Sequence, residues 1–288
     1  MKILVTGSGG QLGKEVLFSL QTSKVEVVGI NREELDFSKP EIVADGIASY
    51  KADWVFNCAA YTQVDKAEEE TELAYRVNRD SAKAVAEGVR SYGGKLIHVS
   101  TDFIFDGKQS HPYSEDDVAN PLGVYGRSKW EGECAVREVL PEATILRTAW
   151  VYGEHGNNFV KTILRLIAER EEIKVVDDQI GTPTWTADLA QVMIMLATNN
   201  NKGVYNFTNE GVASWFDFAV AIKRLAFQYE MINNHCNILP IPASEYPTPA
   251  RRPEYSVLNK AKIRKLMDKP IAHWRDSLEK MIKETSCG

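Results

Sequence analysis

A tyrosine, Tyr125, precedes a lysine, Lys129, by four residues in the segment VYGRSKWEGE, whose pattern predicts a helix. Residues i and i+4 share one face of a helix, so the ammonium lies near the phenol and can lower its pKa. Bringing a free tyrosine from about pH 10 to neutrality takes about 4 kcal/mol, more than one partly solvated lysine supplies. The pair is therefore typical of a proton donor that also depends on burial and a second cation. A solvated helix face is the structural alternative.

A hydroxyl group stands upstream of this pair, at the end of an apolar run. In KLIHVSTDFIF, Ser100, Thr101 and Asp102 end the segment that is expected to form a buried strand. Doubly wound sheets bind ligands at the carboxyl ends of their strands. A threonine hydroxyl there can hydrogen-bond a carbonyl oxygen while Tyr125 protonates that oxygen. Ser and Thr end many strands without such a role, so Thr101 becomes informative only together with Tyr125 and Lys129.

A glycine-rich turn, ILVTGSGGQLGKEV, follows the first predicted strand and opens the first predicted helix. Gly7, Gly10 and Gly13 are spaced three apart. They would allow a tight turn, close approach of a pyrophosphate, and close packing of the helix, with the phosphate at the helix N-terminus. The alternative is a plain strand-turn-helix whose glycines serve geometry alone. Followed in the chain by Thr101 and the tyrosine-lysine pair, the turn favours a dinucleotide-dependent enzyme.

The second predicted strand ends in VVGINREELDF, where dinucleotide-binding proteins usually carry an acidic residue for the adenosine ribose. Here Asn31 and Arg32 occupy that place. Arg32 can hold a 2′-phosphate, which favours NADPH or tolerance of both NADPH and NADH; an exposed arginine at the end of a strand is the other interpretation. Asp36 and Phe37 would bracket the adenine.

The elements that must position these residues alternate regularly. Short apolar runs such as KILVTG, VEVVGI and DWVFNCAA are separated by helical patterns such as LGKEVLFSLQ and EIVADGIASY. This alternation predicts right-handed βαβ units and a doubly wound parallel sheet of the α/β class. About six strands are expected before Gly153.

The pattern changes after Gly153. NNFVKTILRLIAER predicts a long amphipathic helix, which a strand and a loop follow; TADLAQVMIMLA and GVYNFT predict a helix and a strand that return to the sheet. From about Asn237, five prolines by Pro253 predict extended or looped chain, and a last helix is expected over about His273–Glu284. We therefore expect two interleaved units: a dinucleotide-binding domain of residues 1–153 and about 186–235, and a smaller substrate domain of about 154–185 and 236–288.

Composition excludes several classes of protein. The chain has 288 residues and a formal net charge of −6 with no long basic run, which argues against a nucleic-acid partner. Its four cysteines and five histidines are scattered without metal-ligand spacing, which indicates reduced thiols and no metal site. No segment approaches the roughly 20 apolar residues of a membrane span. We expect a cytoplasmic enzyme, monomeric or homodimeric.

The motifs TGSGGQLG, NCAAYT, STDFIFDG and YGRSK, in this order, resemble the extended branch of the short-chain dehydrogenase/reductase superfamily. The resemblance implies a Rossmann fold in which Tyr125 donates a proton, Lys129 binds the nicotinamide ribose and tunes Tyr125, and Thr101 takes the place of the family's hydroxyl. It also implies that Asp102 and Trp150 contact the sugar of a nucleotide-sugar substrate. The cofactor would be lined by Gly10, Gln11, Leu12, Ala60, Tyr61 and Thr62.

Segments such as RTAWVYGEHGNNF, DDQIGTPTW and TPARRPEYSVLN extend the resemblance over the whole chain, to members that reduce the C4 keto group of a dTDP-linked 6-deoxyhexulose. Arg251 and Arg252 are candidates for the nucleotide diphosphate, because a protein of negative charge needs local cations to bind a dianion; salt-bridged loop arginines are an equal alternative. Phe103 stands where the related dehydratases carry a Glu, which argues against a dehydratase.

Three questions stay open at this point. Some family members are described as using magnesium, but beside Glu15 the segment TWTADLA offers only Asp188 as a carboxylate, so we expect no essential metal. A different 4-ketohexose nucleotide reductase or a C4 epimerase would carry the same motifs. The fold also resembles the regulatory subunit of methionine adenosyltransferase, although a protein that only binds a partner has no chemical need for Tyr125 and Lys129.

Overall fold

A six-stranded parallel sheet forms the centre of the computed structural model, which describes residues 1–21, 23–233 and 235–286. Every neighbouring pair of strands in it runs parallel, which confirms the predicted fold class. In spatial order the strands are β10 (Gly203–Asn206), β5 (Thr144–Thr148), β4 (Lys95–Thr101), β3 (Trp54–Asn57), β1 (Lys2–Thr6) and β2 (Glu26–Ile30).

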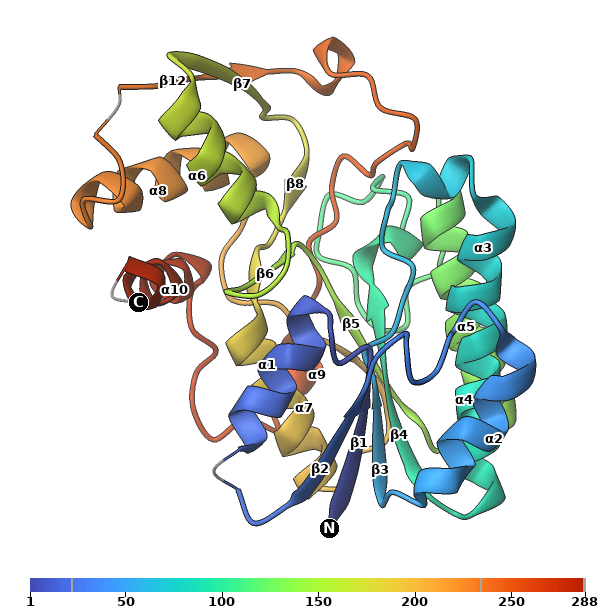
Figure 1. Ribbon diagram of the computed structural model, residues 1–288. Coiled ribbons are helices and arrows are strands. Elements are labelled where there is room, and N and C mark those ends of the chain that lie inside the picture. The colour runs from blue at the N-terminus through green and yellow to red at the C-terminus, as the bar shows by residue number, and fades with distance from the viewer. Residues whose placement is uncertain (22, 234, 287–288) are drawn as a thin grey trace.

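Helices cover both faces of the sheet, as its apolar strands require (Figure 1). One face packs against α2 (Pro40–Tyr50), α4 (Ser81–Ser91) and α5 (Val124–Val139), and the other against α1 (Gln11–Leu20) and α7 (Thr186–Thr198). The side chains of β1 alternate accordingly: Ile3 and Val5 enter the α1–α7 core, and Leu4 enters the other.

The strand order reverses between β1 and β3, because the chain moves from β1 outward to β2 and then returns to the opposite side of β1. Such a reversal leaves a crevice at the carboxyl ends of the two strands, and open α/β sheets bind their ligands there. The glycine-rich turn follows β1 and the segment NCAAYT follows β3. The fold therefore brings these two motifs to one edge of the sheet.

A second unit lies above this edge and to one side (Figure 1). It contains α6 (Phe159–Glu169), β7 (Glu172–Val176), α8 (Trp215–Gln228), β12 (Asn237–Ile241) and α10 (Trp274–Ser286). β7 pairs with β12 in parallel, and α6, α8 and α10 share one apolar core. The domain boundary at about residue 235 stays a prediction. Because α8 packs in this second core, we propose that the second unit resumes at about residue 213.

One expectation about the strands needs correction. Of the strands before Gly153, five lie in the sheet, whereas β6 (Val151–Tyr152) pairs with β9 (Thr184–Trp185) outside it. The chain leaves the sheet at Trp150, whose backbone has φ +48°. A further short pair joins β8 (Ile180–Gly181) to β11 (Ala213–Ser214). The predicted return to the sheet is confirmed by α7 and β10.

Short helical segments complete the fold. Residues 71–91 are helical throughout and comprise α3 (Thr71–Tyr75), a π-helical turn η2 (Arg76–Asp80) and α4. The others are η1 (Lys66–Glu68), η3 (Asp102–Ile104), η4 (Ala243–Glu245) and α9 (Ala261–Arg264). No helix in the described part of the chain is long and apolar enough to cross a bilayer. Cys58, Cys134 and Cys236 are free thiols; Cys287 lies outside the described residues.

Candidate active site

Helix α5 carries Tyr125 on its first turn and Lys129 on its second. The backbone N–H of Val124 donates to Glu68 Oε1 at 2.8 Å, which satisfies one of the free donors at the helix start. The ammonium of Lys129 is 2% exposed and donates to the carbonyl oxygen of Val99 in β4 at 2.6 Å. The ring of Phe103 meets the Tyr125 ring edge-on at 5.5 Å. The structure therefore brings α5 and the end of β4 together, as the sequence predicts.

The pKa of Tyr125 is raised, whereas the sequence predicts that Lys129 lowers it. Burial, with a smaller contribution from the Asp102 carboxylate, raises the pKa of Tyr125 to about 12, against a hydrogen bond with Thr101 that lowers it. The expected lowering by Lys129 is absent among these causes. Burial also lowers the pKa of Lys129, to about 8, against the attraction of the Glu133 carboxylate. Tyr125 is thus a fully protonated acid at neutral pH.

Thr101 and Asp102 begin the 3-10 turn η3 at the end of β4. The Thr101 hydroxyl accepts the Phe103 N–H at 3.2 Å and donates to Asp102 Oδ1 at 3.1 Å. Asp102 is 1% exposed, and burial raises its pKa to about 6, although the hydroxyls of Ser256 and Thr101 oppose the shift. Its Oδ2 atom is buried without a hydrogen-bond partner in the described chain, as is Ser100 Oγ. Such orphaned polar atoms favour a polar ligand at this point.

The raised pKa of Asp102 predicts that this carboxylate destabilises the folded protein at neutral pH. Its folded pKa of about 6 exceeds the ordinary 3.8, so the penalty is complete above pH 6 and disappears as the pH falls toward 4. Asp102→Asn should therefore raise the free energy of unfolding by at most about 3 kcal/mol near pH 8. Urea denaturation at several pH values measures this gain. A gain of equal size near pH 4 would contradict the explanation.

The geometry of the glycine-rich turn agrees with the predicted tight turn at Gly7 and close helix packing at Gly13. Gly7 has φ +64°, and a Cβ there would lie 2.8 Å from the backbone of Ala59, beyond β3. Gly10 is the N-cap of α1, and its N–H donates to the Gly7 carbonyl at 2.9 Å. A Cβ on Gly13 would lie 2.3 Å from that same carbonyl oxygen, so a larger residue would push α1 away from the turn. Backbone without side chains at the N-terminus of a helix can approach a pyrophosphate closely.

Side chains around this turn have defined partners. Leu12 is buried in the α1–α7 core, and Gln11 Oε1 accepts from Asn158 Nδ2 at 3.0 Å, which links the turn to the second unit. Arg32 is 80% exposed and pairs with Asp36 at 3.6 Å, so its guanidinium is open to a ligand. Hydrogen bonds from the backbone N–H and hydroxyl of Ser38 lower the pKa of Asp36.

Two further residues near the turn, Asn31 and Phe37, are less accessible to a cofactor than the sequence predicts. The side-chain oxygen of Asn31 accepts the Glu33 N–H at 2.7 Å. Phe37 is packed in the α2–α4–α5 core with 8% exposure, which leaves little of its ring for an adenine.

The loop of Ala60, Tyr61 and Thr62 is held by a residue that the sequence does not reveal. Asn78 accepts the Tyr61 N–H at 2.9 Å and donates to the Tyr61 carbonyl at 3.1 Å and to Ser128 Oγ at 3.0 Å. Ser128 in turn donates to the Tyr125 carbonyl. Asn78 therefore ties the loop that is expected to line the cofactor to helix α5. It belongs to the π-helical turn η2, a feature common at functional sites but without a sequence signature.

The remaining predicted residues lie near the second unit. Trp150 follows β5 and stacks on Trp215. Arg252 donates to Asp65 Oδ2 at 2.7 Å and to Thr248, which supports the salt-bridge interpretation for this arginine. Arg251 is exposed, and no ion pair involves it within the described residues.

The carboxylates considered for a metal have other contacts. Asp188 accepts from Asn209 and Ser277, and Glu15 accepts from Thr186 at 3.3 Å. No group of three potential metal ligands occurs among the residues that the structure describes.

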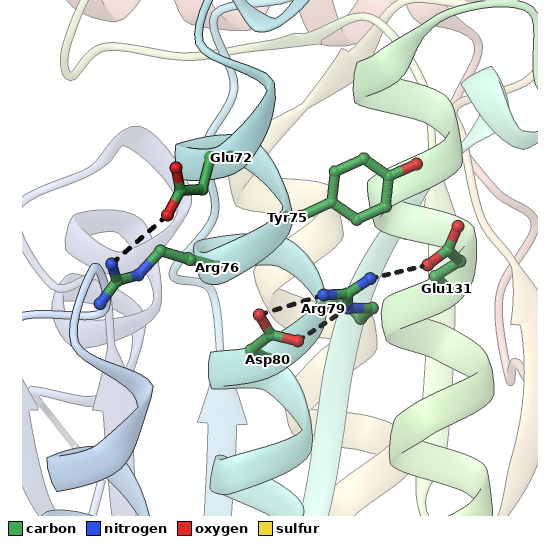
Figure 2. Close-up of a pocket in the computed structure, with 6 residues that line it drawn as sticks. All are labelled: Glu72, Tyr75, Arg76, Arg79, Asp80 and Glu131. Atoms are coloured by element: carbon green, nitrogen blue, oxygen red, sulfur yellow. Dashed lines mark hydrogen bonds and ion pairs between the residues drawn. The ribbon is translucent and has the colours of Figure 1, made fainter.

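A surface pocket is found elsewhere, beside α3, η2 and α5 (Figure 2). Its charged side chains pair among themselves: Arg79 with Asp80 and Glu131, and Arg76 with Glu72. A second pocket lies next to it, at the start of α2 and at α3. None of the residues predicted for the site lines either pocket. We therefore place the candidate site at the carboxyl edge of the sheet.

Comparison with known proteins identifies the family. The profile of the RmlD substrate binding domain matches residues 1–287. The chain is 40% identical, over 96% of its length and 97% of the relative's, to dTDP-4-dehydrorhamnose reductase of Aggregatibacter actinomycetemcomitans. A dTDP-4-dehydrorhamnose reductase of Clostridium acetobutylicum superposes with a TM-score of 0.94 at 40% identity, covering 99% of both chains.

A further solved structure adds a bound cofactor. The dTDP-4-dehydrorhamnose reductase of Bacillus anthracis, in complex with NADP, superposes with a TM-score of 0.92 at 37% identity, covering 98% of this chain and 99% of that one. The similarity thus extends over nearly the entire length of these relatives. The chain belongs to the RmlD substrate binding domain family.

Proposed function

We propose that this protein reduces the C4 keto group of dTDP-4-dehydro-L-rhamnose to dTDP-L-rhamnose with NADPH, and that Tyr125 donates the proton. The observation that carries the proposal is the meeting of Thr101, Tyr125 and Lys129 at the carboxyl edge of the sheet. The substrate is supported by the relative from A. actinomycetemcomitans, whose name states this activity, and the cofactor by the B. anthracis structure, which contains NADP.

The residues present fit a dinucleotide. The bare backbone of Gly7, Gly10 and Gly13 would hold the pyrophosphate, and the open guanidinium of Arg32 would hold a 2′-phosphate. Lys129 would bind the nicotinamide ribose. NADPH, when bound, supplies the hydride that reduces the ketone.

The protein's own groups handle the proton. The Tyr125 phenol, with a pKa of about 12, keeps its proton at neutral pH and can give it to the substrate oxygen as that oxygen gains negative charge. An alkoxide is a far stronger base than a phenolate, so the transfer is downhill. The Thr101 hydroxyl lies beside Tyr125 and would orient the carbonyl, and the burial of Asp102 and Lys129 indicates that little bulk water reaches this point.

The direct test is turnover with defined reagents. Purified protein is mixed with dTDP-6-deoxy-L-lyxo-4-hexulose and either NADPH or NADH, and the loss of the reduced nicotinamide absorbance is followed. We expect stoichiometric loss with NADPH and a product that co-elutes with dTDP-L-rhamnose. Catalytic turnover without net loss would indicate a C4 epimerase. Absence of any reductase activity, with stable co-purification of a synthetase, would indicate a regulatory homologue.

Replacement of Arg251 and replacement of Arg252 should cause different kinds of defect. Arg251→Ala should raise the KM for the nucleotide sugar about tenfold and leave the Tm unchanged, because loss of a charge-assisted hydrogen bond to a phosphate weakens binding by that order. Arg252→Ala removes the partner of Asp65 and should lower the Tm. Steady-state kinetics and thermal melts of both variants distinguish the cases. An unchanged KM in Arg251→Ala would remove this residue from the diphosphate site.

A further inference from the structure

Trp150 has an unusual backbone for a bulky residue. Its φ of +48° lies in the left-handed region, which large side chains rarely adopt without support from their surroundings. The residue stands two positions after Thr148, which pairs in register with Thr101 at the edge of the sheet. The Trp150 carbonyl accepts the Thr184 N–H at 3.1 Å, and the β6–β9 pair that follows holds the chain in this course. The strain therefore lies at the candidate site.

Both faces of the Trp150 ring are covered. The Trp215 ring lies parallel to it, with 3.5 Å between ring centroids and 6° between planes. A Cβ on Gly181 would lie 2.6–2.8 Å from three adjacent atoms of the indole, Cε2, Nε1 and Cζ2, which places this glycine over the ring as well. A ring stacked at 3.5 Å leaves no room for backbone on the same side, so Gly181 covers the opposite face.

The covering residues are themselves joined. Gly181 lies in β8 and pairs in register with Ala213 of β11, and Trp215 follows β11 directly as the first residue of α8. A capping box between Ser214 and Asp217 fixes the start of α8. We name the arrangement of Gly181, Trp150 and Trp215 the tryptophan clamp.

Because the clamp covers the faces of the Trp150 ring, only the edge of the ring can contact a ligand. Its indole N–H has no hydrogen-bond partner among the described residues, and Nε1 is not one of the fully buried unpartnered atoms, so the donor is accessible. Stacking of Trp150 on a base or on the flat face of a sugar is excluded, because neither ring face is free.

We propose that Trp215 is a positioning residue of the nucleotide-sugar site, which with Gly181 fixes Trp150 so that its indole N–H donates to an oxygen of the substrate. This inference rests on the proposed function for the identity of the ligand. Its geometry rests on the contacts of Trp150 alone. An indole N–H is a donor without acceptor capacity, so the atom that it recognises is a hydroxyl, carbonyl or phosphate oxygen.

Four variants test the proposal: Trp215→Ala, Trp215→Phe, Trp150→Phe and the control Phe216→Ala. Phe216 is the neighbour of Trp215 in α8 and is likewise half-buried, so its loss tests general weakening of the second unit. We expect Trp215→Ala and Trp150→Phe each to raise the KM for the 4-keto nucleotide sugar about tenfold, the effect of one hydrogen bond, with kcat within about twofold. Trp215→Phe, which keeps an aromatic face, should restore the KM.

The affinity for NADPH should not change in any variant. Circular dichroism should show an exciton couplet in the wild type that disappears in Trp215→Ala and remains in Phe216→Ala. A wild-type KM in either Trp150→Phe or Trp215→Ala would overturn the proposal, as would an equal rise in Phe216→Ala.

A separate readout keeps this result distinct from the proposed function. The Kd for dTDP-L-rhamnose is measured by calorimetry for the same proteins. If the wild type reduces no 4-keto sugar, the proposed function is wrong, and the clamp is then judged by this Kd. A tenfold weaker Kd in Trp215→Ala and Trp150→Phe, relative to Phe216→Ala, supports it. Equal affinities, or absence of binding to the wild type, overturn it.

Discussion

Replacement of Tyr125 by phenylalanine should lower kcat by about a thousandfold, the range expected when a positioned general acid is removed. The neighbouring Thr101 hydroxyl cannot substitute, because an aliphatic alcohol is a far weaker acid than a phenol. Lys129 would stay engaged with the nicotinamide ribose and with the Val99 carbonyl, to which its ammonium donates at 2.6 Å. Steady-state turnover with NADPH and the 4-keto nucleotide sugar measures the loss, and a Tyr125→Phe enzyme that retains most of its turnover would refute the proposed mechanism.

The expected defect is chemical, so folding and cofactor affinity should survive. The Tyr125 ring contacts Phe103 edge-on, and phenylalanine preserves this contact. Tyr75→Phe is the matched control, because Tyr75 packs in the same apolar cluster as Tyr125 but lies on α3 and lines the surface pocket with Arg79 and Glu131 (Figure 2). Wild-type thermal stability in both variants, with kcat lost in Tyr125→Phe alone, would confirm a specific role for the phenol.

Replacement of Glu133 by alanine should lower the free energy of unfolding by about 4 kcal/mol, because it leaves a buried guanidinium without its counter-charge. Arg147 and Glu133 are 2% and 0% exposed, and three hydrogen bonds of 2.8–3.1 Å join them. Arg147 lies on β5 and Glu133 on α5, so the pair fastens the helix that carries Tyr125 to the sheet. Urea denaturation measures the change.

An exposed ion pair supplies the comparison. Arg165 and Glu169 lie one helical turn apart on α6 with 60% and 54% exposure, and Glu169→Ala should cost less than about 1 kcal/mol. The double replacement of Glu133 and Arg147 by apolar residues of similar size should recover much of the stability lost in Glu133→Ala. A single Glu133→Ala variant within 1 kcal/mol of the wild type would show that water reaches Arg147.

The fold was predictable because its signals are local and repeated. Alternating apolar runs and helical patterns determine a parallel sheet almost regardless of the loops, and the glycine spacing places a dinucleotide turn after the first strand. The predicted glycine roles agree with the geometry at Gly7 and Gly13. The order of Thr101, Tyr125 and Lys129 along the chain predicts that they lie together, since the carboxyl end of a strand and the next helix meet at one edge; their roles stay predictions.

Features that depend on tertiary context were not predictable. No propensity marks the π-helical turn that aims Asn78 at Tyr61, and nothing local places α8 in the second core. The pKa of Tyr125 follows from desolvation, which spacing along a helix does not reveal. The ion pair of Arg252 depends on Asp65, which is far away in the chain. A cytoplasmic location and the choice between monomer and homodimer stay predictions.

The position of β10 has a consequence for how the polypeptide can be made and divided. The strand that completes the sheet at β5 begins at residue 203, after the whole excursion through α6, β7 and α7. During synthesis, β5 therefore emerges from the ribosome with an open edge and, on the α1–α7 side, an uncovered apolar face, both of which invite association with other chains. Exchange of the second unit between two relatives would likewise require two separate chain segments to be moved together. A single crossover between β5 and β10 would leave these two paired strands coming from different proteins.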